Sequence, residues 1–283
     1  MKLSLTSFTR RARVIGAALA LPLMFAGSTP AGAQEARDSE VRAATAPTVV
    51  VGAQSGDGQA STATCPSGTK VANGGFFANT FHYANGGTMY DAVRASYPSS
   101  SGSGWSAQLV RGKVQAFALC VPAAEAPTVV VGSQSGDGQA STATCPSGTK
   151  VANGGFFANT FHYANGGTMY DAVRASYPSS SGSGWSAQLV RGKVQALALC
   201  TPQGGAPTVA VGAQSSDGRA STATCPSGRK AVAGGHFANT FHYANGGEIY
   251  DAVRASYPTT SGNGWAVQLL KGKSQAFALC VTA

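Results

Sequence analysis

The sequence contains few charged residues. Asp, Glu, Lys and Arg make up 11% of the 283 residues, well below the usual share of about a quarter. A long helical or coiled-coil protein needs many more Glu, Lys and Leu, so the composition excludes that class. The chain is 43% hydrophobic and has 37 glycines, which permits a packed core and favours short strands joined by turns.

Two further absences concern partners. After the N-terminal region no segment holds about 18 consecutive apolar residues, so we expect no membrane span in the mature chain. No block of about five like charges occurs either. Nucleic-acid binding needs a clustered basic stripe, and we therefore expect no nucleic-acid partner.

The N-terminus is typical of a secretory signal peptide. Lys2, Arg10, Arg11 and Arg13 precede an apolar run at 14–26, and Ala31-Gly32-Ala33 offers a cleavage site. An uncleaved anchor is the alternative, but the run is short for a span. We predict a signal peptide at 1–33, a flexible leader at 34–45, and a secreted, extracellular protein, whether export uses the general or the twin-arginine route.

Removal of the signal peptide lowers the net charge. Four of the 20 basic residues lie in the signal, which leaves sixteen basic against 11 acidic residues and a net charge of +5.

The mature chain is one unit written three times with a period of 80 residues. The predicted domains are three β repeats at 46–122, 126–202 and 206–283. The first two units differ at two aligned positions, where Ala53 becomes Ser133 and Phe117 becomes Leu197. The joints at 121–125 and 201–205 are short and contain Pro or Gly, so the orientation of neighbouring units is expected to be restricted.

Each unit contains two cysteines. In an exported chain this predicts one disulfide inside each repeat, with pairing between repeats as the alternative. The predicted pairs are Cys65 with Cys120, Cys145 with Cys200, and Cys225 with Cys280. A repeat of this size has a marginal core, and a disulfide would stabilise it.

The turn signals predict about six short strands per repeat and no helix. In the first repeat we expect strands at 47–52, 61–65, 77–84, 88–97, 105–110 and 113–121. Asn85-Gly86 is a strong hairpin signal, residues 99–104 read as a flexible polar loop, and Asn73-Gly74-Gly75 reads as a bulge or close backbone approach. The predicted fold is all-β, with three tandem small β-sandwich or barrel-like domains.

One resemblance rests on residues spread from the first cysteine of each unit to the last. They are Ala63-Thr64-Cys65-Pro66-Ser67-Gly68, Val71, Gly74-Gly75, Ser96-Tyr97-Pro98, Gly104-Trp105 and Ala118-Leu119-Cys120. The pattern resembles an uncharacterised cysteine-bounded repeat module of secreted actinobacterial proteins. The resemblance implies secretion and a β fold, and it implies no activity.

Catalytic and metal chemistry find weak support. His82 would face Asp91 across the predicted hairpin if the turn pairs Asn85 with Thr88, and a slip of one position would pair it with Met89 instead. In the first register Ser96 or Tyr90 could be the nucleophile or acid of a hydrolase. No Gly-x-Ser-x-Gly elbow, metal-ligand cluster or phosphate-binding loop accompanies them. We therefore expect no enzyme activity, no catalytic residues, no cofactor and no metal site.

A binding surface is better supported. Aromatic faces beside amides and charges suit a carbohydrate or an extracellular protein surface, and three copies would give avidity. The predicted ligand-binding residues occupy equivalent positions in the three repeats: Tyr83, Asn85, Tyr90, Asp91, Arg94; Tyr163, Asn165, Tyr170, Asp171, Arg174; and Tyr243, Asn245, Tyr250, Asp251, Arg254.

The expected function is a secreted multivalent binding or adhesion protein. The alternative is a secreted protease inhibitor or antagonist that acts through an exposed loop, with the Arg111-Gly112 turn favoured over 99–104. A hydrolase is the third reading. Trp105 and the phenylalanines at 76, 77, 81 and 117 are expected in the core. The ligand, the oligomeric state and the relative orientation of the repeats do not follow from the sequence.

Overall fold

The computed structural model describes residues 47–80, 82, 91–162, 171–242 and 251–283. The predicted signal peptide and leader lie outside these residues, as do 81 and the segments 83–90, 163–170 and 243–250. The chain divides into two units at Ala43/Ala44, and the described residues belong to the second unit. No helix in the described residues is long and apolar enough to cross a membrane.

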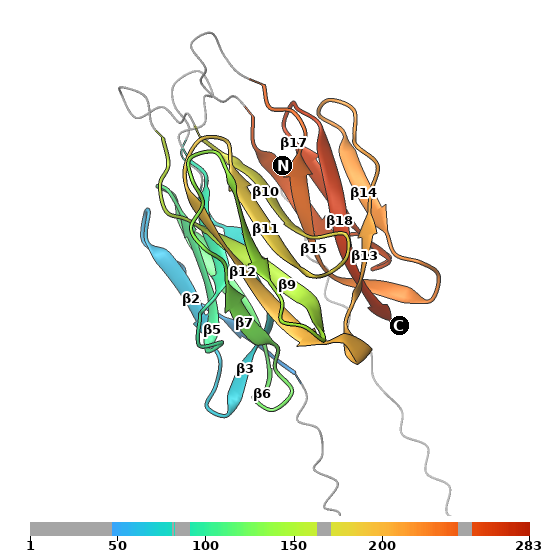
Figure 1. The fold of residues 1–283 in the computed structure, drawn as a ribbon. Coiled ribbons are helices and arrows are strands. Elements are labelled where there is room, and N and C mark those ends of the chain that lie inside the picture. Colours follow the sequence, from blue (N-terminus) through green and yellow to red (C-terminus); the bar gives the residue numbers. More distant parts are fainter. Residues whose placement is uncertain (1–46, 81, 83–90, 163–170, 243–250) are drawn as a thin grey trace, which may run out of the picture. The chain divides into compact units, whose positions relative to one another are not determined.

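The described residues form eighteen strands and one short 3-10 helix (Figure 1). Repeat 1 holds β1 Thr48–Val51, β2 Ala60–Thr64, β3 Thr69–Ala78, β4 Val93–Pro98, β5 Gly104–Leu109 and β6 Val114–Pro122. Repeat 2 holds β7 Thr128–Val131, β8 Ala140–Thr144, β9 Thr149–Ala158, β10 Val173–Pro178, β11 Gly184–Leu189 and β12 Val194–Pro202. After η1 Gln203–Gly205, repeat 3 holds β13 Thr208–Val211, β14 Ala220–Thr224, β15 Arg229–Ala238, β16 Val253–Pro258, β17 Gly264–Leu269 and β18 Ser274–Thr282.

The predicted all-β class and the three disulfides are confirmed. Each repeat is closed by its own bond, Cys65–Cys120, Cys145–Cys200 or Cys225–Cys280. The bond joins the turn after β2 to β6 in the first repeat, and equivalent elements in the others. Six strands per repeat match the predicted number.

One predicted strand is misplaced. The sequence places a strand at 77–84, whereas β3 spans Thr69–Ala78 and pairs along its length with β6. The strand contains the glycine pair Gly74-Gly75, and the Trp105 ring packs against Gly74, where a Cβ atom would overlap it. The register shifts between Val71 and Asn73, so the predicted bulge and close approach are both confirmed.

Residues 99–104 form a hydrogen-bonded turn instead of a flexible loop. The Gly102 amide donates to the Ser99 carbonyl at 2.8 Å, and the Ser99 amide donates to the Gly104 carbonyl at 2.9 Å. Gly102 has φ of 72°, a conformation that glycine adopts without strain.

Two sheets cross the boundaries between repeats. The sheet β2-β5-β4 of repeat 1 continues into β9-β12-β7 of repeat 2, and β8-β11-β10 of repeat 2 continues into β15-β18-β13 of repeat 3. Strands β4 and β9 pair with Ala95 opposite Phe157 and Ser96 opposite Phe156. The hydrogen-bond ladders shared between neighbouring repeats therefore fix their relative orientation. The repeats are not independent domains joined only by linkers.

The core follows the same organisation. Trp105 is 2% exposed, which confirms its predicted place in the core of repeat 1. The core of repeat 2 also includes Ala233 and Leu279 from repeat 3. Phe76 and Phe77 contradict the prediction of burial, since they are 39% and 60% exposed. They lie on β3, which is an edge strand of its sheet.

Candidate functional site

The three repeats point the same way. Strand β4 runs antiparallel to β9, which is the repeat 2 equivalent of β3, and β10 likewise runs antiparallel to β15. Within repeat 1 the end of β3 lies near the start of β4, because Asn79 bonds to Lys113 and Ala92 bonds to Val110. The strands β3 and β4 therefore run in opposite directions. It follows that β3, β9 and β15 all run in the same direction. The ends at which these strands stop, at Ala78, Ala158 and Ala238, therefore lie at one end of the unit. We call this end the loop end.

Three connections of each repeat meet at the loop end. In repeat 1 they are residues 52–59, 79–92 and 110–113. The Gly58 amide donates to the Gly112 carbonyl at 3.0 Å, and the Asn79 amide donates to the Lys113 carbonyl at 2.8 Å. The Lys113 amide in turn donates to Thr80 Oγ1 at 2.9 Å. These bonds join the described residues of the three connections into one polar surface.

A buried aspartate organises this surface. Asp91 Oδ1 accepts hydrogen bonds from the Ala92 and Arg111 amides, both at 2.9 Å, and Oδ2 accepts one from the Gly112 amide at 2.7 Å. Asp91 is 1% exposed, and a Cβ atom on Gly112 would overlap its carboxylate. Asp171 and Asp251 hold the equivalent turns in the same way. These three aspartates therefore have a structural role, which the binding-site prediction did not foresee.

Two opposing effects act on the pKa of the buried Asp171 carboxyl. Burial raises its pKa above the ordinary value, while backbone amides, including those of Arg191 and Gly192, act to lower it.

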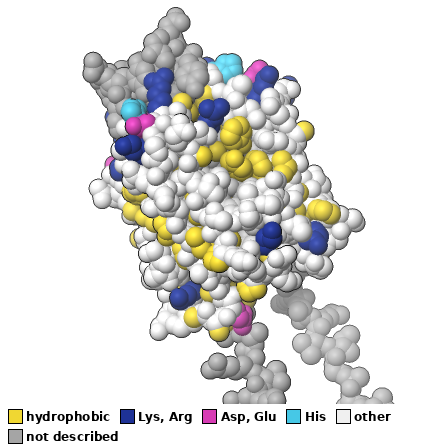
Figure 2. Space-filling view, in the orientation of Figure 1, with side chains coloured by type: hydrophobic (Ala, Val, Ile, Leu, Met, Phe, Trp, Pro, Cys, Tyr) yellow, Lys and Arg dark blue, Asp and Glu magenta, His cyan; other side chains and the backbone are white. Residues whose placement is uncertain are grey.

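The imidazole rings of His82, His162 and His242 contact aspartates other than the expected ones. His82 Nε2 lies 3.4 Å from Asp57 Oδ1, and the pairs His162–Asp137 and His242–Asp217 have 3.5 Å between the same atoms. The predicted pairing of His82 with Asp91 is wrong, because Asp91 is buried beneath the Arg111-Gly112 turn. Both partners of the His82–Asp57 pair are about half exposed. Figure 2 shows histidines beside acidic and basic side chains at the upper end of the unit.

Two of the three predicted arginines, Arg94 and Arg174, lie where a strand of one repeat pairs with a strand of the next. The Arg94 guanidinium carbon is 5.8 Å from the centre of the Phe157 ring, and that of Arg174 is 5.7 Å from the centre of the Phe237 ring. Such cation–π contacts stabilise an interface. Arg254 lines a cavity near Phe77. Arg94 and Arg174 thus contribute to the packing of one repeat against the next.

The remaining predicted ligand-binding residues lie outside the described residues. They are Tyr83, Asn85 and Tyr90, with Tyr163, Asn165 and Tyr170, and Tyr243, Asn245 and Tyr250. The described residues on either side of these segments, such as His82 and Asp91, belong to the loop end.

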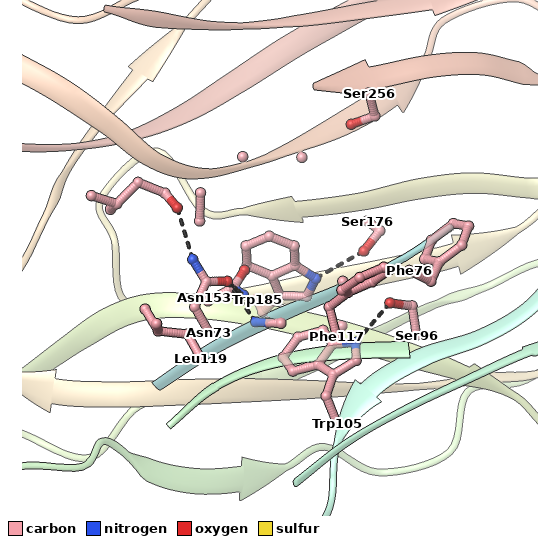
Figure 3. Close-up of a pocket in the computed structure, with 18 of the residues that line it drawn as sticks. Asn73, Phe76, Ser96, Trp105, Phe117, Leu119, Asn153, Ser176, Trp185 and Ser256 are labelled. Atoms are coloured by element: carbon pink, nitrogen blue, oxygen red, sulfur yellow. Dashed lines mark hydrogen bonds between the residues drawn. The ribbon is translucent and has the colours of Figure 1, made fainter. Parts of the chain in front are cut away.

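A cavity of about 550 Å³ lies where the three repeats meet (Figure 3). Its lining includes the tryptophan of each repeat, and each indole Nε1 donates to a serine Oγ: Trp105 to Ser96, Trp185 to Ser176 and Trp265 to Ser256, at 2.9–3.0 Å. Asn153 Nδ2 donates to Asn73 Oδ1, and Asn73 Nδ2 donates to the Val232 carbonyl at 2.8 Å. The asparagines therefore link all three repeats. No sequence signal indicated this cavity, because it forms between repeats.

His236 occupies a special position beside this cavity. It replaces the phenylalanine found at 76 and 156, and its Nε2 atom is buried without a hydrogen-bond partner. Burial lowers the pKa of the imidazole to about 4, although a hydrogen bond with the Val173 backbone opposes this. The ring is therefore neutral near pH 7.

Among the described residues no cluster of three or more His, Cys, Asp or Glu side chains could hold a metal ion. No protein family matches the sequence, and no curated protein matches it.

Proposed function

We propose that this protein is a secreted, trivalent binding protein that presents three equivalent ligand-binding segments from one end of a rigid unit. The observation that carries the proposal is the common direction of the three repeats, set by the β4–β9 and β10–β15 ladders. Segments 79–92, 159–172 and 239–252 connect equivalent strands at that end. Each is the longest connection of its repeat, and long connections on a rigid scaffold commonly carry binding.

The ligand class follows from the residues in these segments. Each segment contains two tyrosines, two asparagines and a histidine, which offer aromatic faces next to hydrogen-bonding groups. Such side chains suit a glycan or an exposed protein surface on a cell. A repetitive ligand would engage three sites at fixed spacing, so that weak individual sites give strong attachment.

Binding of the full chain to arrayed glycans and to isolated bacterial cell walls tests the proposal. We expect Tyr83→Ala to weaken binding, and the triple change at Tyr83, Tyr163 and Tyr243 to abolish it, because avidity requires several sites. The matched control is a triple change to Ala at Thr64, Thr144 and Thr224, which are exposed at the opposite ends of their repeats. Retained binding by the tyrosine triple variant would contradict the proposal.

One observation favours a second function, inhibition of an extracellular protease. The Arg111-Gly112 turn is held rigid by Asp91, and rigidity favours an inhibitory loop because little conformational freedom is lost on binding. The triple change of Arg111, Arg191 and Lys271 to Ala would abolish inhibition of a protease that cleaves after basic residues. If the unaltered chain inhibits no such protease, this second function is excluded.

A further inference from the structure

The two strand pairings between neighbouring repeats, which we call joints from here on, share one pattern. At each joint a strand with the sequence VRASYP pairs with a strand from the next repeat: β4 with β9, and β10 with β15. Tyr97 packs edge-to-face on Phe157 with 5.7 Å between ring centres, and Tyr177 packs on Phe237 at 5.9 Å. The arginine that is the second residue of each VRASYP strand lies over the same phenylalanine ring.

The two strands that would form a third such pairing are present, but they do not pair with each other. Strand β16 has the same sequence, VRASYP, as β4 and β10, and β3 has the same sequence as β9. Both are edge strands of their sheets. We call the region between them the seam, defined by β3 and β16.

The apolar side chains of the seam are unusually exposed. Phe77 is 60% and Tyr257 is 49% exposed, and Phe76 is 39% exposed where Phe156 is 5% exposed. Leu119 is also less buried than its equivalents Leu199 and Leu279. Exposed edge strands that carry apolar side chains favour pairing with another strand.

The two edges of the seam face one another within the chain. Phe76, Phe77 and Ala78 from β3 and residues 253–256 of β16 line a single cavity of about 340 Å³. Repeats 1 and 3 are already joined by the hydrogen bond from Asn73 Nδ2 to the Val232 carbonyl. A strand of the same chain is therefore held close to its partner at a high effective concentration.

We propose that β16 pairs antiparallel with β3 and closes the three repeats into a ring. The register of the other joints places Ala255 opposite Phe77 and Ser256 opposite Phe76. Closure forms a third six-stranded sheet and packs Tyr257 and Arg254 on Phe77. It also buries both exposed edges and encloses the cavity between the repeats. The inference does not depend on the proposed binding function, since it concerns the contact between repeats alone.

Engineered disulfides test the closure. Two double variants place cysteines across the seam, Phe76→Cys with Ser256→Cys and Phe77→Cys with Ala255→Cys. The matched controls, Phe156→Cys with Ser96→Cys and Phe157→Cys with Ala95→Cys, place cysteines at the same positions of a formed joint. After mild oxidation, peptide mass spectrometry of the monomer should find the seam cross-link at the same yield as the control. A cross-link in the control but not at the seam would overturn the proposal.

A mixing experiment separates closure from pairing between two copies. One chain carries Phe76→Cys and the other carries Ser256→Cys. Closure predicts no disulfide-linked dimer, because β3 is occupied by its own β16. Abundant heterodimer would overturn closure and show that the seam joins two copies.

Hydrogen exchange of the unaltered chain gives an answer that does not depend on any variant. Closure predicts that the amides of Ala255–Tyr257 exchange as slowly as those of Ala175–Tyr177, which lie in the formed β10–β15 joint. Exchange faster by about a hundredfold or more at 255–257 would show that β16 is a free edge strand, and would contradict the ring.

Discussion

Repeats 1 and 2 are nearly the same sequence in two different surroundings. Phe156 is almost fully buried and the equivalent Phe76 is not. The difference arises because β9 has β4 as a neighbour, whereas β3 is the last strand of its sheet. Burial of these residues is thus decided by what a distant part of the chain places beside them. The comparison also shows what ring closure would gain, since it would give β3 the surroundings of β9.

Among the tests of this comparison between repeats, removal of a disulfide should change the unfolding free energy most. Each bond closes a loop with a sequence separation of 55, and its loss is expected to cost about 4 kcal/mol of unfolding free energy. A ring gives every repeat two joints, so the double changes to Ala at Cys65 and Cys120 and at Cys145 and Cys200 should cost the same. Urea unfolding followed by circular dichroism measures both. A clearly greater loss for the central repeat would indicate an open seam.

Substitution of two equivalent glycines, Gly75 and Gly155, tests whether the seam is closed. A Cβ atom on Gly155 would overlap the Ser96 carbonyl of the neighbouring repeat, whereas nothing lies within 4 Å of one on Gly75. Gly155→Ala should cost about 1–3 kcal/mol through overpacking at the joint. In a closed ring Gly75→Ala should cost about as much, and with an open seam it should be neutral. Thermal unfolding distinguishes the two results, with Gly204→Ala, which has open space around it, as the control.

His236, which has no histidine equivalent in repeats 1 and 2, predicts a pH dependence of stability that those repeats lack. The pKa of His236 falls from 6.5 to about 4 on folding, so below pH 6.5 the unfolded chain binds a proton that the folded chain excludes. Stability is therefore complete above pH 6.5 and decreases as the pH falls toward 4. At pH 5.5 the loss is about 1.4 kcal/mol.

His236→Phe supplies the residue of the first two repeats and should remove this part of the pH dependence. Urea unfolding at pH 7.5 and 5.5 compares the two proteins. An equal loss of stability in both proteins would show that another group is responsible.

The smallest effect is expected at the exposed ion pairs of the loop end. Asp57→Asn removes the partner of His82, and because both groups are about half exposed, the stability should change by less than about 1 kcal/mol. Asp91→Asn, by contrast, alters a buried carboxylate that accepts three backbone amides, and it should cost more than Asp57→Asn by thermal unfolding. Equal costs would contradict the structural role of Asp91.

Local patterns predicted the elements whose signals are local. The turn at Arg111-Gly112, the disulfide pairs and the burial of Trp105 are confirmed. The strands on either side of this turn do not form a hairpin, because β5 and β6 belong to different sheets. The position of β3 was misread, because Gly74 and Gly75 weaken a strand unless a neighbour packs on them, and Trp105 lies 31 residues further along the chain. The role of Asp91 was missed for a similar reason, since its partners are backbone amides of a turn that is distant in sequence.

The sequence by itself determined that this protein consists of three like β repeats, each closed by its own disulfide. Alternating polarity, turn residues and the cysteine spacing act over short distances or within one repeat, so they can be read from the chain. Only the tertiary structure decided that the repeats share sheets, point in one direction and meet around a cavity. Those properties depend on which strand edges find each other, and identical edges in the sequence have different neighbours in space.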